Sequence, residues 1–147
     1  MALLNAVIDL SHHNNVTSYQ DIRDAGIVGI IHKATQGVTG VDGTYGTRKP
    51  QALAAGLLWG AYHFASKGNA QKQADHFLDV VQPGPTDLLV LDFEPNAHDG
   101  TMTVAEFARP SDCSYEVRRG APPWGWCDRP VIGGCSAIVA LCRYLPA

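Results

Sequence analysis

Four apolar segments dominate the chain, and each is continuous rather than alternating with polar residues. They span residues 4–10, 27–32, 57–64 and 88–94. Continuous apolar strands are typical of sheets that are covered on both faces, because a strand with one solvated face would alternate. Helices are expected in the stretches between them, at residues 18–24, 47–55 and 69–81. Strands that alternate with helices predict parallel β-α units, so the fold class is α/β.

The 147 residues fit one domain, but the composition changes near residue 108. All four Lys lie before residue 73 and all four Cys lie after residue 112. We therefore divide the chain into a β/α region, 1–107, and an atypical tail, 108–147, which is either part of the same domain or irregular. We hypothesise that the tail comes from a frameshift or a recombined gene end. The Cys spacing matches no zinc pattern, so free thiols are expected.

Charge and hydropathy exclude several classes of partner. The formal net charge is −3, which argues against a nucleic-acid partner, since such a partner calls for a basic face. No apolar run approaches the roughly 20 residues that span a bilayer, so no membrane partner is expected. The first residues lack a basic region, and we expect no signal peptide. Action outside the cell or at a cell wall would then require lysis, another export route or processing that the sequence does not show.

Two carboxylates end the fourth apolar segment. Asp92 and Glu94 are two residues apart on the expected strand 88–94, so both side chains should leave the same face. Their Cα atoms would lie about 6.6 Å apart, which brings the carboxyl groups near the ~5–5.5 Å typical of retaining glycosidases. Such a pair does not ionise independently, so one member can keep a proton and act as a general acid. The alternative is a solvated acid pair or a metal ligand.

Polar and aromatic residues also mark the ends of the other three apolar segments. In α/β folds the active site lies at the carboxyl ends of the strands, so these side chains are expected to converge on the acid pair. Aromatic rings there can stack on sugar faces. The alternatives are a turn cap for Asp9, a solvated Lys33 and core packing for the aromatics. The predicted site residues beside the pair are Asp9, Lys33, Tyr62, His63 and Phe64.

Two further groups of residues are candidates for metal binding and for sugar binding at this site. Asp9 with His12 and His13 could suggest a metal, but adjacent imidazoles rarely converge on one ion, so we expect no metal and no cofactor. A metal-dependent hydrolase using Asp9, His12 and Asp92 remains the weaker alternative. Trp124 and Trp126 resemble a sugar platform, although they lie in the tail.

Five segments of the chain together resemble the family 25 glycoside hydrolases, the N-acetylmuramidase lysozymes of bacteria, fungi and phages. Any one segment is weak, but their order and spacing match as well. They are Val-Ile-Asp-Leu-Ser-His-His-Asn at 7–14, Ile-His-Lys-Ala-Thr-Gln-Gly at 31–37, Ala-Ala-Gly-Leu-Leu-Trp-Gly-Ala-Tyr-His-Phe at 54–64, Gln-Ala-Asp-His-Phe at 73–77 and Leu-Asp-Phe-Glu at 91–94.

The resemblance implies a modified (β/α) barrel of TIM type that cleaves the β-1,4 bond between N-acetylmuramic acid and N-acetylglucosamine in peptidoglycan. It implies that Glu94 is the proton donor. Asp92 would be the anionic partner, either as nucleophile or by orienting the substrate's N-acetyl group. Asp9 would be a third acid at the pocket floor, and Lys33 and Tyr62 would line the substrate groove.

The tail departs from the family pattern. Family members supply further strands after the fourth, and no segment after Phe107 matches them. We therefore expect a barrel that is incomplete in its C-terminal strands. Open edges invite pairing, so association of two copies through them is also expected. The alternative function is a catalytically impaired remnant that binds peptidoglycan without turnover.

Overall fold

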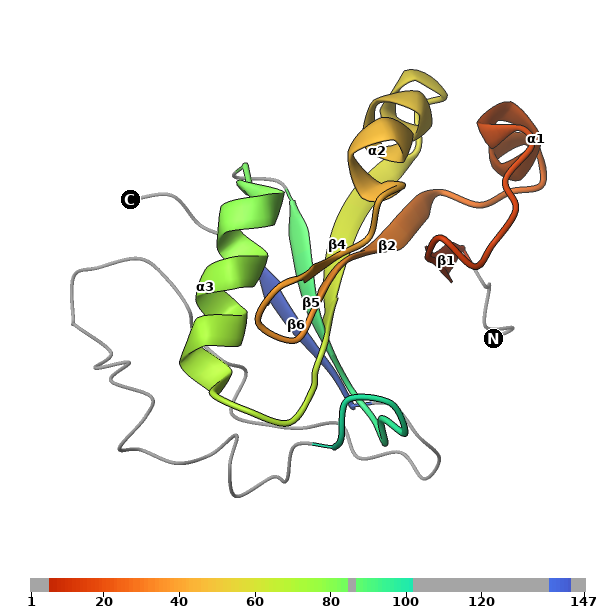
Figure 1. The fold of residues 1–147 in the computed structure, drawn as a ribbon. Helices are drawn as coiled ribbons and strands as arrows, with labels where there is room; N and C mark the ends of the chain where they lie inside the picture. The colour runs from red at the N-terminus through yellow and green to blue at the C-terminus, as the bar shows by residue number, and fades with distance from the viewer. Residues whose placement is uncertain (1–5, 85–86, 102–137, 144–147) are drawn as a thin grey trace, which may run out of the picture.

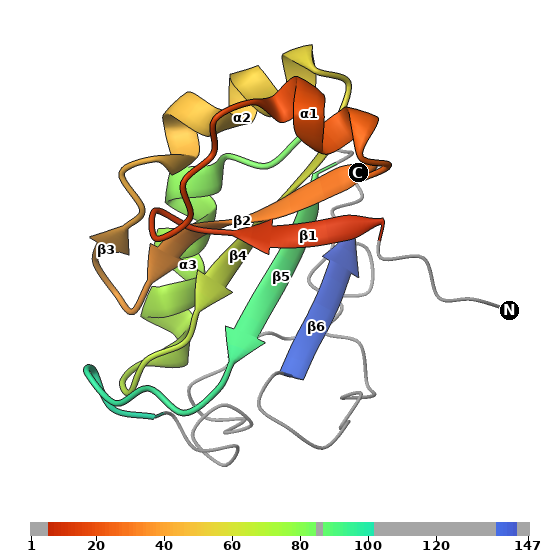
Figure 2. The same cartoon turned by 90° about the vertical axis from the view of Figure 1, so that its right-hand side faces the viewer.

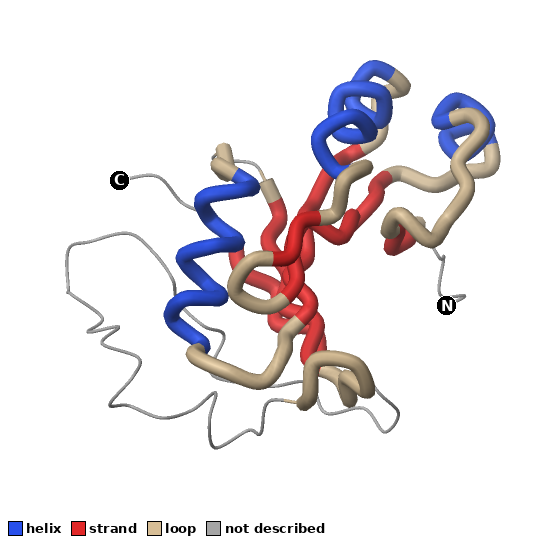
Figure 3. Tube along the Cα trace, in the orientation of Figure 1, coloured by secondary structure: helices blue, strands red, loops and turns tan. Residues whose placement is uncertain are grey.

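The computed structural model describes residues 6–84, 87–101 and 138–143. Its elements form a single sheet flanked by helices (Figures 1 and 3). In chain order they are β1 (Val7–Leu10), α1 (Tyr19–Asp24), β2 (Gly29–Gln36), β3 (Gly40–Val41), α2 (Tyr45–Ala54), β4 (Leu58–Phe64), α3 (Ala70–Val81), β5 (Leu88–Phe93) and β6 (Ile138–Arg143).

The sheet has the strand order β1-β2-β4-β5-β6, and β3 pairs with β2 away from this path. The pairs β1–β2, β2–β4 and β4–β5 are parallel, whereas β6 runs antiparallel to β5 (Figure 2). The predicted α/β class with parallel β-α units is therefore confirmed. The strand β6 comes from the tail, so this part of 108–147 belongs to the same sheet. In the described residues β1 and β6 are opposite ends of an open sheet.

The helices begin where the sequence places their caps. The Ser18 side chain accepts a hydrogen bond from the Asp21 N–H at 3.1 Å, and Asn69 accepts one from the Lys72 N–H at 2.9 Å. Each contact satisfies one of the N–H groups that a first turn leaves without a partner. The helix predicted from residue 47 begins two residues earlier, at Tyr45. No described helix is long and apolar enough to cross a membrane.

The second strand is longer than the apolar pattern indicates. It was expected to end at residue 32, but β2 continues to Gln36 and turns back through β3, a strand in the predicted loop. Residues Thr35 and Gln36 pair with Val41 and Gly40. A Cβ at Gly40 would lie 2.7 Å from the Gln36 carbonyl oxygen, so only glycine fits this hairpin. Polar composition hid the strand end, because Thr35 and Gln36 are held there by pairing with both β3 and β4 rather than by an apolar pattern.

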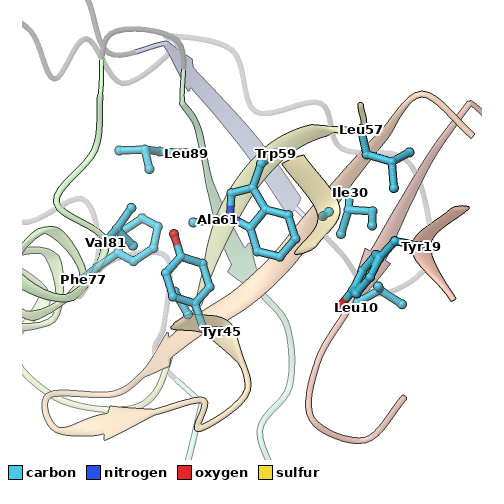
Figure 4. Packing of buried hydrophobic residues seen from close by; sticks show 12 residues of the cluster. Leu10, Tyr19, Ile30, Tyr45, Leu57, Trp59, Ala61, Phe77, Val81 and Leu89 are labelled. Atoms are coloured by element: carbon cyan, nitrogen blue, oxygen red, sulfur yellow. The ribbon is translucent and has the colours of Figure 1, made fainter. Parts of the chain in front are cut away.

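One face of the sheet packs against all three helices. The core joins Leu10, Ile30, Trp59, Ala61 and Leu89 from the strands with side chains of α1, α2 and α3. Figure 4 shows Tyr45 and Trp59 in the middle of this cluster, with ring centroids 5.8 Å apart. The remaining members of the cluster are Tyr19, Ala34, Tyr45, Ala52, Leu57, Phe77 and Val81.

The other face of the sheet is less covered than predicted. Val7 is 48% exposed and Leu58 is 70% exposed. The expectation that both faces are covered is thus wrong for this part of the described sheet. The physical reason is topological: a closed barrel would bury these side chains against the opposite strands, and the described sheet stays open.

Buried Gln73 connects α3 to the strand β4. Its amide nitrogen donates to the Ser66 carbonyl at 2.8 Å, and its oxygen accepts from the Ser66 N–H at 3.0 Å and from His63 Nε2 at 3.1 Å. Gln73→Ala leaves these buried groups without partners, so we expect it to destabilise the protein by about 2–4 kcal/mol. Thermal unfolding measures the loss. The matched control is Gln71→Ala, whose amide reaches only the exposed Asp75, and an equal loss there would contradict the prediction.

Candidate active site

Strand register places most of the predicted site residues on the face of the sheet opposite the helices. Lys33 pairs with Tyr62, and Phe64 pairs with Asp92. Asp9 pairs with Ile31, two residues before Lys33 on the same face. Side chains two apart on a strand share a face, so these five lie together at the carboxyl end of the parallel strands. The predicted convergence is therefore confirmed for them.

Asp92 is the most perturbed acid of the group. It is half-buried near the end of β5, and its carboxyl has a pKa raised to about 6. Burial is the largest cause of this rise, the negative charges of Glu94 and Asp9 add to it, and Lys33 opposes it. Glu94 follows the last strand residue, Phe93, so the pair straddles the strand end rather than lying within it. The two carboxylates still interact, which is what general acid–base chemistry needs.

Lys33 lies inside β2, where the sequence placed it after a strand end. Its ammonium donates to the Gln36 side-chain oxygen and sits 4.8 Å from the centroid of the Phe64 ring. Gln36 in turn donates to Asp99. Burial lowers the pKa of Lys33, and the carboxylates of nearby aspartates oppose this. Sequence reasoning missed Gln36, although its place three residues after Lys33 in the matching segment was a usable signal.

Tyr62 presents a neutral phenol to this face. Its side chain is half-buried, and burial raises its pKa above the ordinary value. The charges of Asp92 and Asp9 raise it further. A phenol that keeps its proton can donate a hydrogen bond to a sugar oxygen while its ring packs against the sugar.

His63 does not lie at the site, which corrects its predicted substrate-binding role. It is buried on the helix side, where its Nδ1 accepts from the Thr35 hydroxyl at 2.7 Å and its Nε2 donates to Gln73. Burial lowers its pKa to about 4, so it is neutral at pH 7. The reason is strand alternation: as the neighbour of Tyr62 and Phe64, His63 must face the opposite way.

His12 is bound by a residue that sequence reasoning missed. Its Nδ1 lies 2.8 Å from the carboxylate of Asp42, which also accepts from the His12 backbone N–H at 2.8 Å. Asp42 lies in the Gly/Thr-rich segment 35–46, whose polar composition does not predict a buried carboxylate. In the described residues no group of three or more His, Cys, Asp or Glu side chains could hold a metal ion. The metal-dependent alternative, with Asp9, His12 and Asp92 as ligands, thus finds no support there.

Some predictions fall on parts of the chain outside the described residues. They are the sugar platform of Trp124 and Trp126 and the thiols of Cys113, Cys127 and Cys135. The structure describes only the backbone of β6, so the thiol of Cys142 lies outside it as well.

Comparisons with known proteins agree on one family. The model described as "Glycosyl hydrolases family 25" matches residues 8–121, beyond residue 107, where the resemblance was expected to end. The chain is 36% identical over 74 residues to "Lysozyme M1" of Streptomyces globisporus, which covers 48% of this chain. Its fold is similar to a bacterial lysozyme from Streptomyces coelicolor, with a TM-score of 0.58, 32% identity and 65% of this chain covered. It is also similar to a family GH25 lysozyme from Aspergillus fumigatus, with a TM-score of 0.57, 28% identity and 71% covered.

The chain spans only part of these relatives. The match covers 24% of Lysozyme M1, 46% of the Streptomyces coelicolor chain and 51% of the Aspergillus fumigatus chain. Residues 8–121, which the family model matches, include β2, β4, β5, the three described helices and the acids described above.

Proposed function

Because the chain belongs to glycosyl hydrolase family 25, we propose that it is a lysozyme that hydrolyses the β-1,4 bond between N-acetylmuramic acid and N-acetylglucosamine in peptidoglycan. The observation that carries this proposal is the group of acids at the carboxyl end of the sheet. Asp92 has a raised pKa there beside Glu94 and Asp9. Strongly perturbed acids at such an edge are typical of catalytic sites.

In the proposed mechanism, Glu94 donates its proton to the glycosidic oxygen as the bond to the sugar breaks. Asp92, in its anionic form, attacks the anomeric carbon or orients the substrate's N-acetyl group for that attack. Water then completes the reaction and returns a proton to Glu94. We propose that Asp9 adds negative charge that stabilises the cationic transition state, and that Lys33, Tyr62 and Phe64 hold the sugar.

Release of reducing ends from purified cell walls tests the proposed function. We expect the purified chain to generate reducing ends in proportion to time and protein, and to lower wall turbidity. Walls whose glycan has been fully digested beforehand with a known muramidase are the substrate control, because they offer no intact bonds. No release of reducing ends above buffer would contradict hydrolysis.

A second candidate function is supported by the open sheet. The described strands do not close into a barrel, and Leu58 on the open face is 70% exposed. A sheet that is not closed could hold wall glycan without turning it over. This remnant is expected to sediment with peptidoglycan while releasing no reducing ends. The barrel closure and the pairing of two copies through sheet edges stay predictions in either case.

The proposed partner in both cases is the glycan strand of peptidoglycan, and the proposed place of action is the cell wall. Fractionation of the producing cells tests the location, and recovery with wall material is the expected result.

A further inference from the structure

A groove of about 430 Å³ lies beside the acids, and none of the roles proposed above uses most of it. Its walls come from the loops that follow β1, β4 and β5 and from the β2–β3 hairpin. Lys33 lines it and also interacts with Asp92, so the groove adjoins the reacting bond of the proposed function. The charged and titratable side chains on its walls are His12, Lys33, Asp42, Lys67 and Asp99.

We propose that this groove binds a carboxylate carried by the wall glycan next to the cleaved bond, through His12 and Lys67. This inference rests on the proposed function for the choice of polymer. Peptidoglycan carries carboxylates on the lactyl group of its muramic acid or on the attached peptide, and the groove chemistry fits either source.

His12 is held in place by a buried negative charge. The Asp42 side chain is 0% exposed, while that of His12 is 47% exposed. Burial alone would raise the pKa of Asp42, but hydrogen bonds from Thr44 and His12 hold it well below its usual range. Asp42 is therefore anionic, and Nδ1 of His12 must donate to it. The other ring nitrogen, Nε2, has no hydrogen-bond partner among the described residues, and in the imidazolium form of the ring it can donate to a carboxylate.

Lys67 supplies a cation that no carboxylate of the described residues neutralises. Its backbone N–H donates to the Gly100 carbonyl at 2.9 Å, and its aliphatic stem packs there, where a Cβ at Gly100 would lie 3.2 Å from the Lys67 Cβ. The ion pairs found in the described residues are His12–Asp42 and Lys49–Asp87, so Lys67 has no carboxylate within 4.0 Å among them. Its ammonium is therefore available to an anion.

Asp99 opposes the cations of the groove. Its side chain is exposed and accepts a hydrogen bond from Gln36. The carboxylate of Asp42, by contrast, is hydrogen-bonded to His12 and Thr44. An anion in the groove is thus attracted by the ammonium groups of Lys67 and Lys33 and repelled by the carboxylate of Asp99. Changes at Lys67 and at Asp99 should then have opposite signs.

Binding of small soluble glycans to the intact chain tests the proposal without any need for turnover. The probes are the N-acetylglucosamine–N-acetylmuramic acid disaccharide with a free lactyl carboxylate, the same disaccharide with a dipeptide that carries the carboxylate, and uncharged diacetylchitobiose. Calorimetry measures each dissociation constant. The variants are Lys67→Gln, His12→Gln and Asp99→Asn. The control is Lys72→Gln, an exposed residue that does not line the groove.

We expect Lys67→Gln and His12→Gln to weaken the binding of one or both carboxylate probes by about threefold to tenfold. The affinity for chitobiose should not change. Asp99→Asn is expected to lower the dissociation constants of the same probes. The control variant Lys72→Gln is expected to leave every dissociation constant unchanged. The probe that responds identifies the carboxylate source. Equal effects on chitobiose, no effect of Lys67→Gln, or weaker binding in Asp99→Asn would each overturn the proposal. If the chain shows this selectivity but releases no reducing ends, the carboxylate-binding groove is supported and the proposed hydrolysis is contradicted.

Discussion

Glu94→Gln is expected to lower the rate of reducing-end release from cell walls by at least about 100-fold, because general acid catalysis contributes roughly 10²–10⁴-fold. The amide keeps the size and the hydrogen-bonding capacity of the side chain but has no proton to donate. Glu94 lies just beyond β5 and half-exposed, so the fold should persist. Rates on purified walls, with circular dichroism and thermal unfolding of the same samples, measure both effects.

Asp79→Asn is the matched control for the loss of a carboxylate charge. Asp79 is exposed on α3, on the helix side of the sheet, and takes no part in the acid group. It should retain the wild-type rate. If Glu94→Gln hydrolyses walls at the same rate as Asp79→Asn, the proposed role of Glu94 as proton donor is contradicted. If the wild-type chain itself is inactive but binds walls, the second candidate function is supported instead.

Asp92→Asn is expected to inactivate the protein and, at pH 7–8, to stabilise it. The folded-state pKa of Asp92 is about 6, above the ordinary 3.8, so proton binding favours the folded state. Below pH 3.8 the carboxyl is neutral in both states and costs nothing. As the pH rises from 3.8 through 6, the folded state loses stability, and above pH 6 the whole penalty is present. Asparagine carries no charge and avoids it.

Thermal unfolding of Asp92→Asn and wild type between pH 3.5 and pH 8 measures this effect. The variant should unfold a few degrees higher at pH 8, and the two curves should meet near the acid end. Asp79→Asn should follow the wild type throughout. A pH-independent difference would mean that packing, not the charge of Asp92, separates the proteins. The same titration predicts that the wild-type hydrolysis rate falls as the pH drops below about 6, because the proposed mechanism needs Asp92 as the anion.

The candidate site was largely predictable because strand periodicity and connection order are local properties. Asp9, Tyr62, Phe64 and Asp92 could be assigned to one face from alternation and from the rule that parallel strands end at a common edge. The same alternation predicts His63 on the face opposite Tyr62 and Phe64, and the structure buries it there, away from the acids. The long β2 was not predictable, since its polar end at Gln36 is stabilised by pairing with Gly40.

The sequence by itself determined the α/β class, the starts of α1 and α3, the family and the acid pair at Asp92 and Glu94. Each of these depends on residues close together in the chain or on motifs in a fixed order. Only the tertiary structure decided which acid has the raised pKa, that His63 belongs to the helix layer, and that Asp42 holds His12 in a groove. Burial and charge–charge interaction depend on distances between residues far apart in the chain, such as the 30 positions between His12 and Asp42, and those distances exist only after folding.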